Sequence, residues 1–558
     1  MKVSDFVLNF LSEHGVKHVF LITGGVIVPL VDAFAGREDI RYICVQHEQA
    51  AAMAADGYAR FAGLGCAMAT SGPGATNLIT GIGCSYFDSI PVIYITGQVN
   101  TREAKGSSGV RQRGFQETDI VSIVQPITKF ARYVAEKEDI QYVLEAALWY
   151  AQEGRPGPVL VDIPINIQQE EIDPYTLMHF GPPRESRTRI DTTVIEELIS
   201  KAEKPVIIYG QGCRKYKAQL LKFIEKSGIP CLPSWAALDL IPHEHDQFLS
   251  QFGVYGCRAG NFAVQNADLV LALGTRLDSR MTGSKGFAPK AKIVMVNHDK
   301  SEMDKIDCIQ VHADVGKFLR SITVEHKDYE SWYAQIKEWW EKYKIVPPAD
   351  FSMKLNPITF VNGLCEALPD DAILVADAGA NLSWVQQAIR IKGTQRIFSA
   401  YGYSPMGYSL PAAIGAHYAT GKQVVCLIGD GGVQINIQEF QTLFRYQIPV
   451  KVFVFNNEGY GIIRQFQDEL CEGRHEATDN QHGVSNPDFS AVAKAYKITG
   501  LKLIQRAEVN VTLFVGITLH MVGPVVCDVI LDPLARIEPK TRYGSPLDKQ
   551  YPLLENVI

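Results

Sequence analysis

Two polar clusters in the last third of the chain carry side chains suited to binding a metal ion and a phosphate. Asp430 lies in the glycine turn at 429–432, directly after the apolar run Val424–Ile428, and Asn457 follows the apolar run Val452–Phe455. A carboxylate oxygen and an amide oxygen are hard ligands, which Mg²⁺ accepts together with phosphate oxygens and water. The residue types therefore predict a Mg²⁺–diphosphate site at these two positions.

The segment between the two clusters has the pattern of a helix. Ile437, Phe440, Leu443 and Phe444 are spaced for one helical face, so the stretch is expected to form a βαβ unit. Both clusters should then lie at the carboxyl ends of neighbouring parallel strands, where open α/β sheets bind ligands. Glycines let backbone N–H groups approach a phosphate at a helix N-terminus. The candidate phosphate-binding glycines are Gly429, Gly431 and Gly432.

A lone GDG turn is common, so its spacing from the next motif is the more specific feature. Residues 432–455 separate the GDG turn from Asn456-Asn457. This spacing resembles the fingerprint of the thiamine diphosphate-dependent decarboxylases and carboligases. The resemblance implies thiamine diphosphate and Mg²⁺ as cofactors. It also implies Asp430, Asn457 and the carbonyl of Gly459 as metal ligands, with cofactor contacts from Gly379 and Met406, although a methionine alone is more often a core residue.

The elements that must position these residues form three α/β segments. Helical patterns alternate with short apolar strands such as Val19–Ile22 and Cys66–Thr70, as in doubly wound folds. We expect an α/β protein of three doubly wound parallel-sheet domains, at 1–172, 190–326 and 355–558. Linkers are expected at 173–189 and around Pro347-Pro348.

Composition excludes several classes of function. The 558 residues carry a net charge of −7, with 46% hydrophobic and 21% charged residues, which gives no electrostatic case for nucleic acid. The 11 cysteines form no CxxC pair, so we expect reduced thiols, a cytoplasmic location and no zinc site. Neither a signal peptide nor an 18-residue apolar run is present, so no membrane association is expected.

Glu48 opens an alanine-rich helical pattern that runs to Arg60, directly after an expected strand. Taken alone, a glutamate here is a favourable charge at a helix N-terminus. In the thiamine-dependent enzymes, one glutamate at this junction contacts the aminopyrimidine and helps the cofactor's own amine to remove the thiazolium C2 proton. The resemblance gives this role to Glu48. The glycine-rich turn Ser71–Asn77 is also shown by the family, but it could be only a tight connection.

Nearly the whole chain resembles the acetolactate synthase family, the catalytic subunits of acetohydroxyacid synthase, with pyruvate oxidase-like relatives. The loop 23–27 is similar to its PGGAI-type loop, and 114–117 (GFQE) is similar to its AFQE segment. The resemblance places Gly25, Phe115 and Gln116 at the reaction centre, with a core position as the alternative for Phe115. The two adjacent histidines of simple pyruvate decarboxylases are missing from 107–113, which favours capture of the two-carbon unit by a carbonyl acceptor.

The expected middle domain carries a second set of candidate cofactor contacts. Its LGTRLDSR run at 273–280 is similar to a segment that acetolactate synthases place on FAD. An arginine can bind a diphosphate, and carboxylates at strand ends can accept sugar hydroxyls. FAD in a structural role is therefore expected, and an empty relic domain is the alternative. The candidate residues are Gly210, Gly212, Gly274, Thr275, Arg276, Asp299 and Asp314.

Three segments depart from the family pattern and leave the acceptor open. Residues 465–467 read QFQ where biosynthetic enzymes have a QWQ-type run, 379–382 read GANL, and 537–553 match the biosynthetic enzymes poorly. The leading hypothesis is decarboxylation of pyruvate with transfer to a keto acid, as in acetolactate synthases. The alternatives are transfer to a nucleotide-linked 4-keto sugar and, from another class, a non-catalytic scaffold, against which Glu48, Asp430 and Asn457 together argue. The resemblance also implies a homodimer or homotetramer, because the family builds each site from two subunits.

Overall fold

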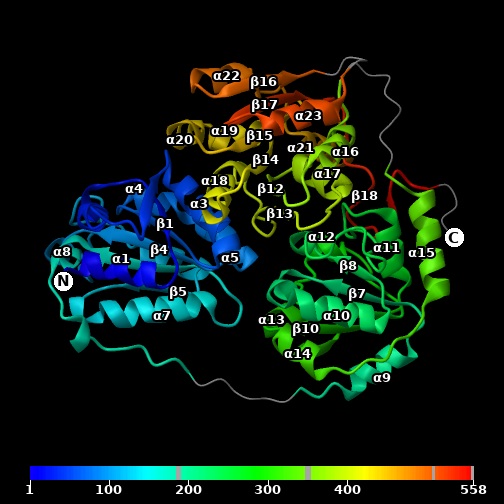
Figure 1. The fold of residues 1–558 in the computed structure, drawn as a ribbon, viewed down its shortest axis with the longest axis horizontal. Coiled ribbons are helices and arrows are strands. Elements are labelled where there is room, and N and C mark those ends of the chain that lie inside the picture. Colours follow the sequence, from blue (N-terminus) through cyan, green and yellow to red (C-terminus); the bar gives the residue numbers. More distant parts are fainter. Residues whose placement is uncertain (184–189, 346–353, 505–508, 555–558) are drawn as a thin grey trace.

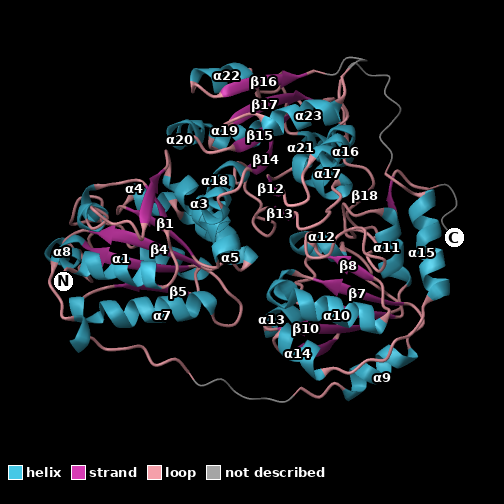
Figure 2. Ribbon diagram, in the orientation of Figure 1, coloured by secondary structure: helices cyan, strands magenta, loops and turns pink. Residues whose placement is uncertain are grey.

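The structure is a computed structural model that describes residues 1–183, 190–345, 354–504 and 509–554. Within these residues the chain forms three parallel sheets, each covered by helices (Figures 1 and 2). The prediction of an α/β chain with three doubly wound parallel-sheet domains is confirmed. The predicted linker at Pro347-Pro348 and the end of the linker at 173–189 lie outside the described residues.

The first domain is built on a parallel sheet of order β2-β1-β3-β4-β6-β5. Its central strand β4 is buried along its whole length, as expected for a sheet with helices on both faces. The strands are β1 (His18–Leu21), β2 (Arg41–Cys44), β3 (Gly65–Ala69), β4 (Val92–Gln98), β5 (Phe130–Tyr133) and β6 (Val159–Pro164). The helices are α1 (Val3–Glu13), α2 (Val28–Asp32), α3 (Glu48–Ala62), α4 (Pro73–Asn77), α5 (Ile79–Asp88), α6 (Ile120–Val124), α7 (Ile140–Gln152) and α8 (Ile165–Gln169).

The middle domain contains a parallel sheet of order β11-β10-β9-β7-β8 and has its own apolar core. The strands are β7 (Pro205–Tyr209), β8 (Cys231–Pro233), β9 (Leu269–Leu273), β10 (Lys292–Asn297) and β11 (Ile309–His312). The helices are α9 (Thr193–Lys201), α10 (Lys217–Ser227), α11 (Arg258–Asn266), α12 (Ser279–Thr282), α13 (Lys300–Met303), α14 (Val315–Ser321) and α15 (Glu330–Lys342).

The third domain contains a parallel sheet of order β13-β12-β14-β15-β17-β16, and a short antiparallel pair, β18 (Lys540–Thr541) and β19 (Gln550–Tyr551), follows it. The strands of the sheet are β12 (Ile373–Ala376), β13 (Arg396–Phe398), β14 (Val424–Gly429), β15 (Val450–Asn456), β16 (Thr499–Leu503) and β17 (Val525–Ile530). The helices are α16 (Pro357–Ala367), α17 (Ala380–Ala388), α18 (Ser409–Thr420), α19 (Asp430–Ile435), α20 (Phe440–Tyr446), α21 (Gly461–Leu470), α22 (Phe489–Ala495) and α23 (Val511–His520).

Helices α3 and α18 join the first domain to the third (Figure 1). Both are rich in small residues, and their backbones approach closely at two glycines. A Cβ atom on Gly57 would lie 2.2 Å from the carbonyl oxygen of Ala412, and one on Gly415 would lie 1.9 Å from the carbonyl oxygen of Ala54. A single apolar core therefore extends across both domains.

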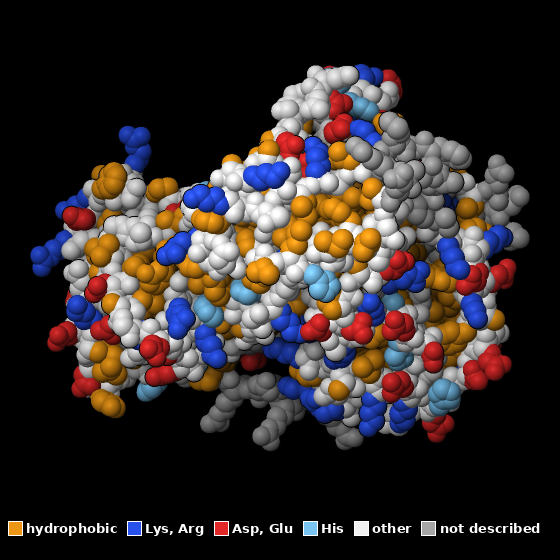
Figure 3. Space-filling view, turned by 45° about the horizontal axis from the view of Figure 1, so that its top comes forward, with side chains coloured by type: hydrophobic (Ala, Val, Ile, Leu, Met, Phe, Trp, Pro, Cys, Tyr) orange, Lys and Arg blue, Asp and Glu red, His pale blue; other side chains and the backbone are white. Residues whose placement is uncertain are grey.

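The surface carries charges of both signs. On the face shown in Figure 3, acidic and basic side chains are interspersed, with apolar side chains between them. In the described part of the chain, no helix is long and apolar enough to cross a membrane.

The contact between α3 and α18 predicts that Gly415→Ala destabilises the protein. The new methyl group would meet backbone atoms of α3, which cannot move aside, so we expect the free energy of unfolding to fall by about 1–3 kcal/mol. Gly516→Ala in α23 is the matched control, because a Cβ there meets nothing within 4 Å. It should leave the stability unchanged or raise it by about 0.5–1 kcal/mol. Thermal unfolding measures both, and equal midpoints for the two variants would contradict the close packing.

Candidate functional site

The two predicted polar clusters lie side by side at one edge of the third sheet. Strands β14 and β15 are parallel neighbours, with Gly429 opposite Phe455. Asp430 and Asn457 therefore both leave the sheet at its carboxyl edge, in agreement with the βαβ prediction. Asp430 is the first residue of α19, which begins directly at the end of β14.

Asp430 is buried and held in place by three donors. The backbone N–H of Gly431 donates to its Oδ1 at 2.7 Å, and the N–H of Gly459 donates to its Oδ2 at 2.9 Å. The side-chain amide of Asn486 also donates to Oδ2, at 2.8 Å. Burial raises the pKa of Asp430 to about 6, although these hydrogen bonds oppose the shift. A buried carboxylate whose pKa is raised by desolvation gains from a nearby cation.

The side-chain amide of Asn457 and the carbonyl oxygen of Gly459 lie next to each other in the turn after β15. The side-chain amide of Asn457 lies 3.1 Å from the carbonyl oxygen of Gly459 and 3.1 Å from Nη2 of Arg464. With its NH₂ towards Gly459, the amide makes two hydrogen bonds within the protein. With its oxygen towards Gly459, two oxygens face each other at about the 3 Å that separates adjacent ligands of octahedral Mg²⁺. The donor set of one carboxylate, one amide and one carbonyl therefore fits Mg²⁺.

Close contacts require glycine at two positions of this edge. A Cβ atom on Gly431 would lie 2.2 Å from the ring of Tyr460 and 3.1 Å from Cε of Met406. One on Gly432 would lie 2.1 Å from Oδ2 of Asp377, whereas Gly429 has open space. Gly379, at the N-terminus of α17, has a φ of +79°, which favours glycine. The structure thus brings Gly431, Gly432 and Met406 together at the turn that carries Asp430, and Gly379 follows the neighbouring strand β12.

Asp377, at the end of β12, is a buried residue to which the sequence gave no role. Its carboxylate accepts the backbone N–H groups of Gly407 and Ser409, each at 3.0 Å. Burial raises its pKa to about 6. Asp377 therefore fixes the loop that carries Met406 against the glycine turn at 429–432. Its position one residue after an apolar strand, beside Gly379, was the available signal in the sequence.

Glu48 begins α3 and lies beside the glycine-rich turn of the first domain. Asn77 donates to Oε2 of Glu48 at 2.9 Å, and a Cβ atom on Gly74 would lie 3.5 Å from Oε1. Thr70 connects this group to the predicted loop at 23–27, because a Cβ atom on Gly24 would meet its side chain at 2.4 Å. The next residue, Gly25, is exposed. The structure therefore brings Glu48 and Gly25 to the same edge of the first sheet.

The loop with Phe115 and Gln116 lies against this edge. Gln116 has a φ of +62°, and its carbonyl oxygen would be 2.9 Å from a Cβ atom on Gly72. The carboxylate of Glu117 closes the loop by accepting the backbone N–H groups of Lys105 and Arg113, at 2.6 and 2.9 Å. Phe115 is 84% exposed, so within one chain it is not a core residue.

Glu439 connects the third domain, which carries Asp430, to the start of α3, which carries Glu48. It is buried in the third domain, and its carboxylate accepts the backbone N–H of Gln46, two residues before Glu48, at 3.0 Å. Thr442 donates to its other oxygen at 2.6 Å, and burial raises its pKa to about 7. The start of α3 is therefore held by the third domain. No local pattern in the sequence marks Glu439, because the residue that it contacts lies 393 positions away.

A cavity of about 790 Å³ opens between the middle domain and the other two. Of the seven residues predicted to bind FAD, five line it: Gly212, Gly274, Thr275, Arg276 and Asp314. Gly210 lies under Gly274, where a Cβ atom would meet the Gly274 carbonyl oxygen at 2.3 Å. Asp299 caps α13 and forms an ion pair with Arg155 at 3.2 Å, while its neighbours His298 and Glu302 line the cavity.

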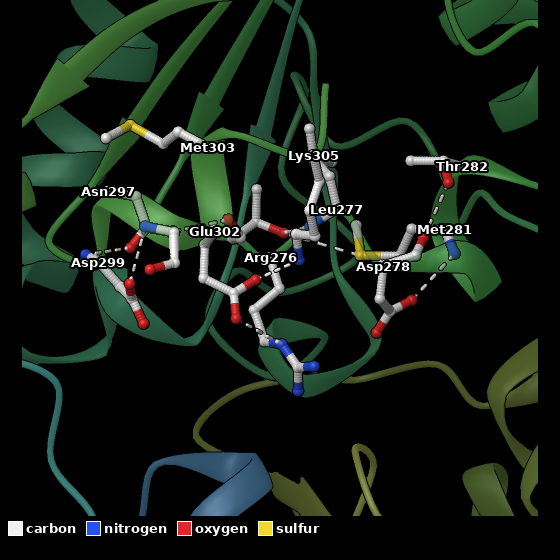
Figure 4. Close-up of polar contacts among 12 residues, drawn as sticks. Arg276, Leu277, Asp278, Met281, Thr282, Asn297, Asp299, Glu302, Met303 and Lys305 are labelled. Atoms are coloured by element: carbon white, nitrogen blue, oxygen red, sulfur yellow. Dashed lines mark hydrogen bonds and ion pairs between the residues drawn. The ribbon is translucent and has the colours of Figure 1, made fainter. Parts of the chain in front are cut away.

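Arg276 points from the middle domain towards the first and third domains (Figure 4). Its Nη1 donates to the carbonyl oxygen of Phe87 at 2.9 Å, and its Nε lies 3.6 Å from Glu302. Nε is buried without a hydrogen-bond partner. The cavity volume of about 790 Å³ lies within the range of about 300–1,000 Å³ that is typical of small-molecule sites.

Comparison with known proteins gives full-length similarity. Three models of the family described as "Thiamine pyrophosphate enzyme" match the chain. The N-terminal TPP binding domain matches residues 1–123, the central domain matches 193–322 and the C-terminal TPP binding domain matches 377–529. A probable acetolactate synthase large subunit of Methanocaldococcus jannaschii is 34% identical, covering 96% of this chain and 92% of that protein. The isozyme 2 large subunit of Escherichia coli (strain K12) is 32% identical, with 98% of each chain covered. A chloroplastic acetolactate synthase of Zea mays is 33% identical, covering 98% and 88%.

The buried carboxylate predicts a metal-dependent loss of cofactor in Asp430→Asn. Calorimetric titration should show no Mg²⁺-dependent affinity for thiamine diphosphate, because an anionic ligand is lost. Asp371→Asn, which changes an exposed carboxylate of the same domain, is the control and should bind normally. Unchanged affinity in Asp430→Asn would remove this residue from the metal site.

The raised pKa of Asp430 also predicts a pH dependence. Because a metal ligand must be deprotonated, Mg²⁺-dependent binding should weaken as the pH falls below about 6. In the metal-free protein, the contribution of Asp430 to the free energy of unfolding should instead be largest at low pH. A carboxyl group whose folded pKa is raised stabilises the fold most at low pH, and this contribution is lost as the pH rises through about 6. Thermal unfolding from pH 5 to 8, with and without cofactor and metal, measures both trends.

Proposed function

The chain belongs to the thiamine pyrophosphate enzymes, and we propose that it acts on pyruvate as an acetolactate synthase. The observation that supports this proposal is the full-length similarity to proteins of that name, together with the sequence motifs that contain Glu48, Asp430 and Asn457. When bound, thiamine diphosphate supplies the chemistry by which a 2-keto acid loses CO₂ and its two-carbon unit passes to a second carbonyl compound.

At the third domain, the proposal assigns cofactor binding to the edge of β14 and β15. Asp430, Asn457 and the carbonyl of Gly459 would hold Mg²⁺. The backbone of Gly431 and Gly432 would approach the diphosphate, because neither carries a side chain that would prevent it. Met406, in contact with Gly431, would support the cofactor between its two rings.

At the first domain, Glu48 would exchange a proton with the pyrimidine ring. Asn77 holds its Oε2, and among the described residues no hydrogen bond occupies Oε1. Oε1 is therefore the atom available to the ring. Phe115 and Gln116 would line the space where the substrates react.

We propose a homodimer or a higher homo-oligomer as the active form. Phe115 is 84% exposed and Gly25 is also exposed, yet both are assigned to a reaction centre that must exclude water. A second copy of the chain would cover them. Since every cysteine of the described chain is unpaired, we also propose a reducing, cytoplasmic location.

For the middle domain we propose FAD in a structural role. Arg276 would contact the diphosphate, and Asp314 would accept sugar hydroxyls. Gly212 and Gly274 bring two strand ends together, since a Cβ atom on Gly212 would lie 2.9 Å from Cα of Gly274. The flavin has no electrons to transfer in the proposed reaction.

Glu48→Gln should reduce turnover without reducing cofactor affinity. The amide cannot exchange the proton, so we expect turnover to fall by about 10²–10⁴, whereas thiamine diphosphate binding stays within about threefold of the wild type. Exchange of the C2 proton of the bound cofactor, followed by NMR, isolates this step. Glu138→Gln, at an exposed position of the same domain, is the control. Normal exchange in Glu48→Gln would refute the assignment.

The FAD proposal predicts a yellow protein that releases FAD on denaturation. Arg276→Gln should weaken flavin binding by about tenfold or more, because a charged hydrogen bond to phosphate is lost. Lys290→Gln, which changes an exposed side chain of the middle domain, should not. The absorbance of the bound flavin should remain constant during pyruvate turnover. A colourless and fully active preparation would return this domain to an empty relic.

Product analysis tests the proposed reaction itself. Pyruvate alone should give acetolactate, with little preference for 2-ketobutyrate as acceptor, because Phe466 offers less contact area than the tryptophan of the family pattern. Phe466→Trp should raise that preference by about 10-fold, the scale of one methylene-sized contact. If a nucleotide-linked 4-keto sugar greatly accelerates the consumption of pyruvate, the sugar is the acceptor and the acetolactate proposal fails.

A further inference from the structure

The C-terminal arm, defined here as residues 536–552, joins the third domain to the middle domain (Figure 1, β18). On the middle-domain side, Arg258 donates to the carbonyl oxygen of Gln550 at 3.1 Å, and the Gln550 side chain donates to the carbonyl oxygen of Gly256 at 2.8 Å. Asn261 donates to the carbonyl oxygen of Leu547 at 3.0 Å. The arm is therefore an ordered part of the fold.

The other side of the arm lies along α21. The side chain of Gln465 forms a reciprocal pair with the backbone of Ile537: its Nε2 donates to the carbonyl oxygen at 3.1 Å, and its Oε1 accepts the N–H at 3.0 Å. Arg536 forms an ion pair with Asp468 on the same helix. These contacts fix the register between the arm and α21.

Lys540 projects from this fixed backbone onto α21. Its neighbours are held on both sides, because Gln387 donates to the carbonyl oxygen of Pro539 at 2.9 Å and the N–H of Thr541 donates to Val254 at 2.8 Å. The Lys540 ammonium lies 2.9 and 3.0 Å from the two carboxylate oxygens of Glu469, and 4.2 Å from the ring centroid of Phe466. Lys540 is only 3% exposed.

The burial of Lys540 gives this contact its significance. An ammonium group removed from water requires compensating partners, and here they are one carboxylate and one aromatic face. A cation is attracted to the face of a ring, and more strongly where the cation is shielded from water, as Lys540 is. The ring of Phe466 itself is half-buried. Lys540 therefore fixes the position of the Phe466 ring. Because the middle domain holds the arm in place, that position depends on the contacts between the arm and the middle domain.

Helix α21 connects Phe466 to the metal edge. It begins directly after the turn that contains Asn457 and Gly459, and Arg464 on the helix donates to the carbonyl oxygen of Asn457 at 2.9 Å. Phe466 is two residues further along the helix. The two departures from the family pattern, at 465–467 and at 537–553, are thus in direct contact with each other.

We propose that Lys540 is a positioning residue that fixes the ring of Phe466 and so determines which second keto acid the enzyme accepts. The inference rests on the proposed function, since it assigns Phe466 to the acceptor side of the reaction. Acceptor preference then depends on the Lys540–Phe466 pair, and Phe466 alone does not determine it.

A double-mutant cycle tests the pair. Lys540→Met, Phe466→Leu and the double variant are assayed with pyruvate and 2-ketobutyrate in competition, and the ratio of the two products is measured. Lys540→Met should change the ratio by about three- to tenfold, the range for a buried cation–π contact. The double variant should show no further change beyond Phe466→Leu. Lys540→Arg, which keeps the cation, should restore the wild-type ratio.

Arg536→Met is the matched control, because it removes an ion pair between the same arm and the same helix without touching Phe466. It should lower the thermal midpoint as Lys540→Met does, yet leave the product ratio unchanged. Equal ratios in Lys540→Met and wild type, or effects of the two single variants that simply multiply, would overturn the proposal.

The measurement on the wild-type protein separates this proposal from the proposed function. If the wild type forms no acetolactate from pyruvate, the proposed function is wrong, and the cycle is judged on the ratio between the two best acceptors that a panel identifies. If Lys540→Met changes the ratio between those two acceptors, the positioning role is supported for that reaction. If Lys540→Met leaves that ratio unchanged, the proposal is overturned.

Discussion

The close contact between α3 and α18 is the constraint on which the rest of the molecule depends. Gly57 and Gly415 remove the side chains that would keep the two helix backbones apart, so the first and third domains share one core. Because α3 begins at Glu48 and α18 follows the loop with Met406, the same contact orients both candidate cofactor-binding edges. A shift of one helix along the other would displace the two edges relative to each other. The small residues of the interface prevent such a shift, because they allow the two backbones to pack closely.

Buried carboxylates perform two different tasks in this framework. Asp377 and Glu439 each accept backbone N–H groups from a distant loop, so their negative charge is compensated within the protein and the loop is fixed. Asp430 also accepts backbone N–H groups, and one of them comes from Gly459, whose carbonyl oxygen lies beside the Asn457 amide. Because these neighbours offer further oxygen ligands, Asp430 is the one of the three carboxylates for which we propose metal binding.

The sequence predicted the elements of the site better than their supports. The βαβ unit around Asp430 could be read from the spacing of apolar runs and glycines, because strand, turn and helix are local patterns. Asp377 and Glu439 could not be assigned, because their partners are far along the chain and nothing nearby signals the contact. Asp299 shows the same limit: its ion pair with Arg155 of another domain could not be predicted from the sequence, while its contact with a sugar stays a prediction.

The exposed side chain of Phe115 is the physical reason to propose assembly. A large apolar side chain at 84% exposure is costly to leave in water, and it lies on a loop whose shape is strictly held by Glu117. Gln116 beside it keeps a left-handed φ of +62°, a conformation that persists only where the surroundings enforce it. The loop thus holds an apolar side chain at the surface of the single chain, and this exposed residue is the basis on which we propose a homo-oligomer.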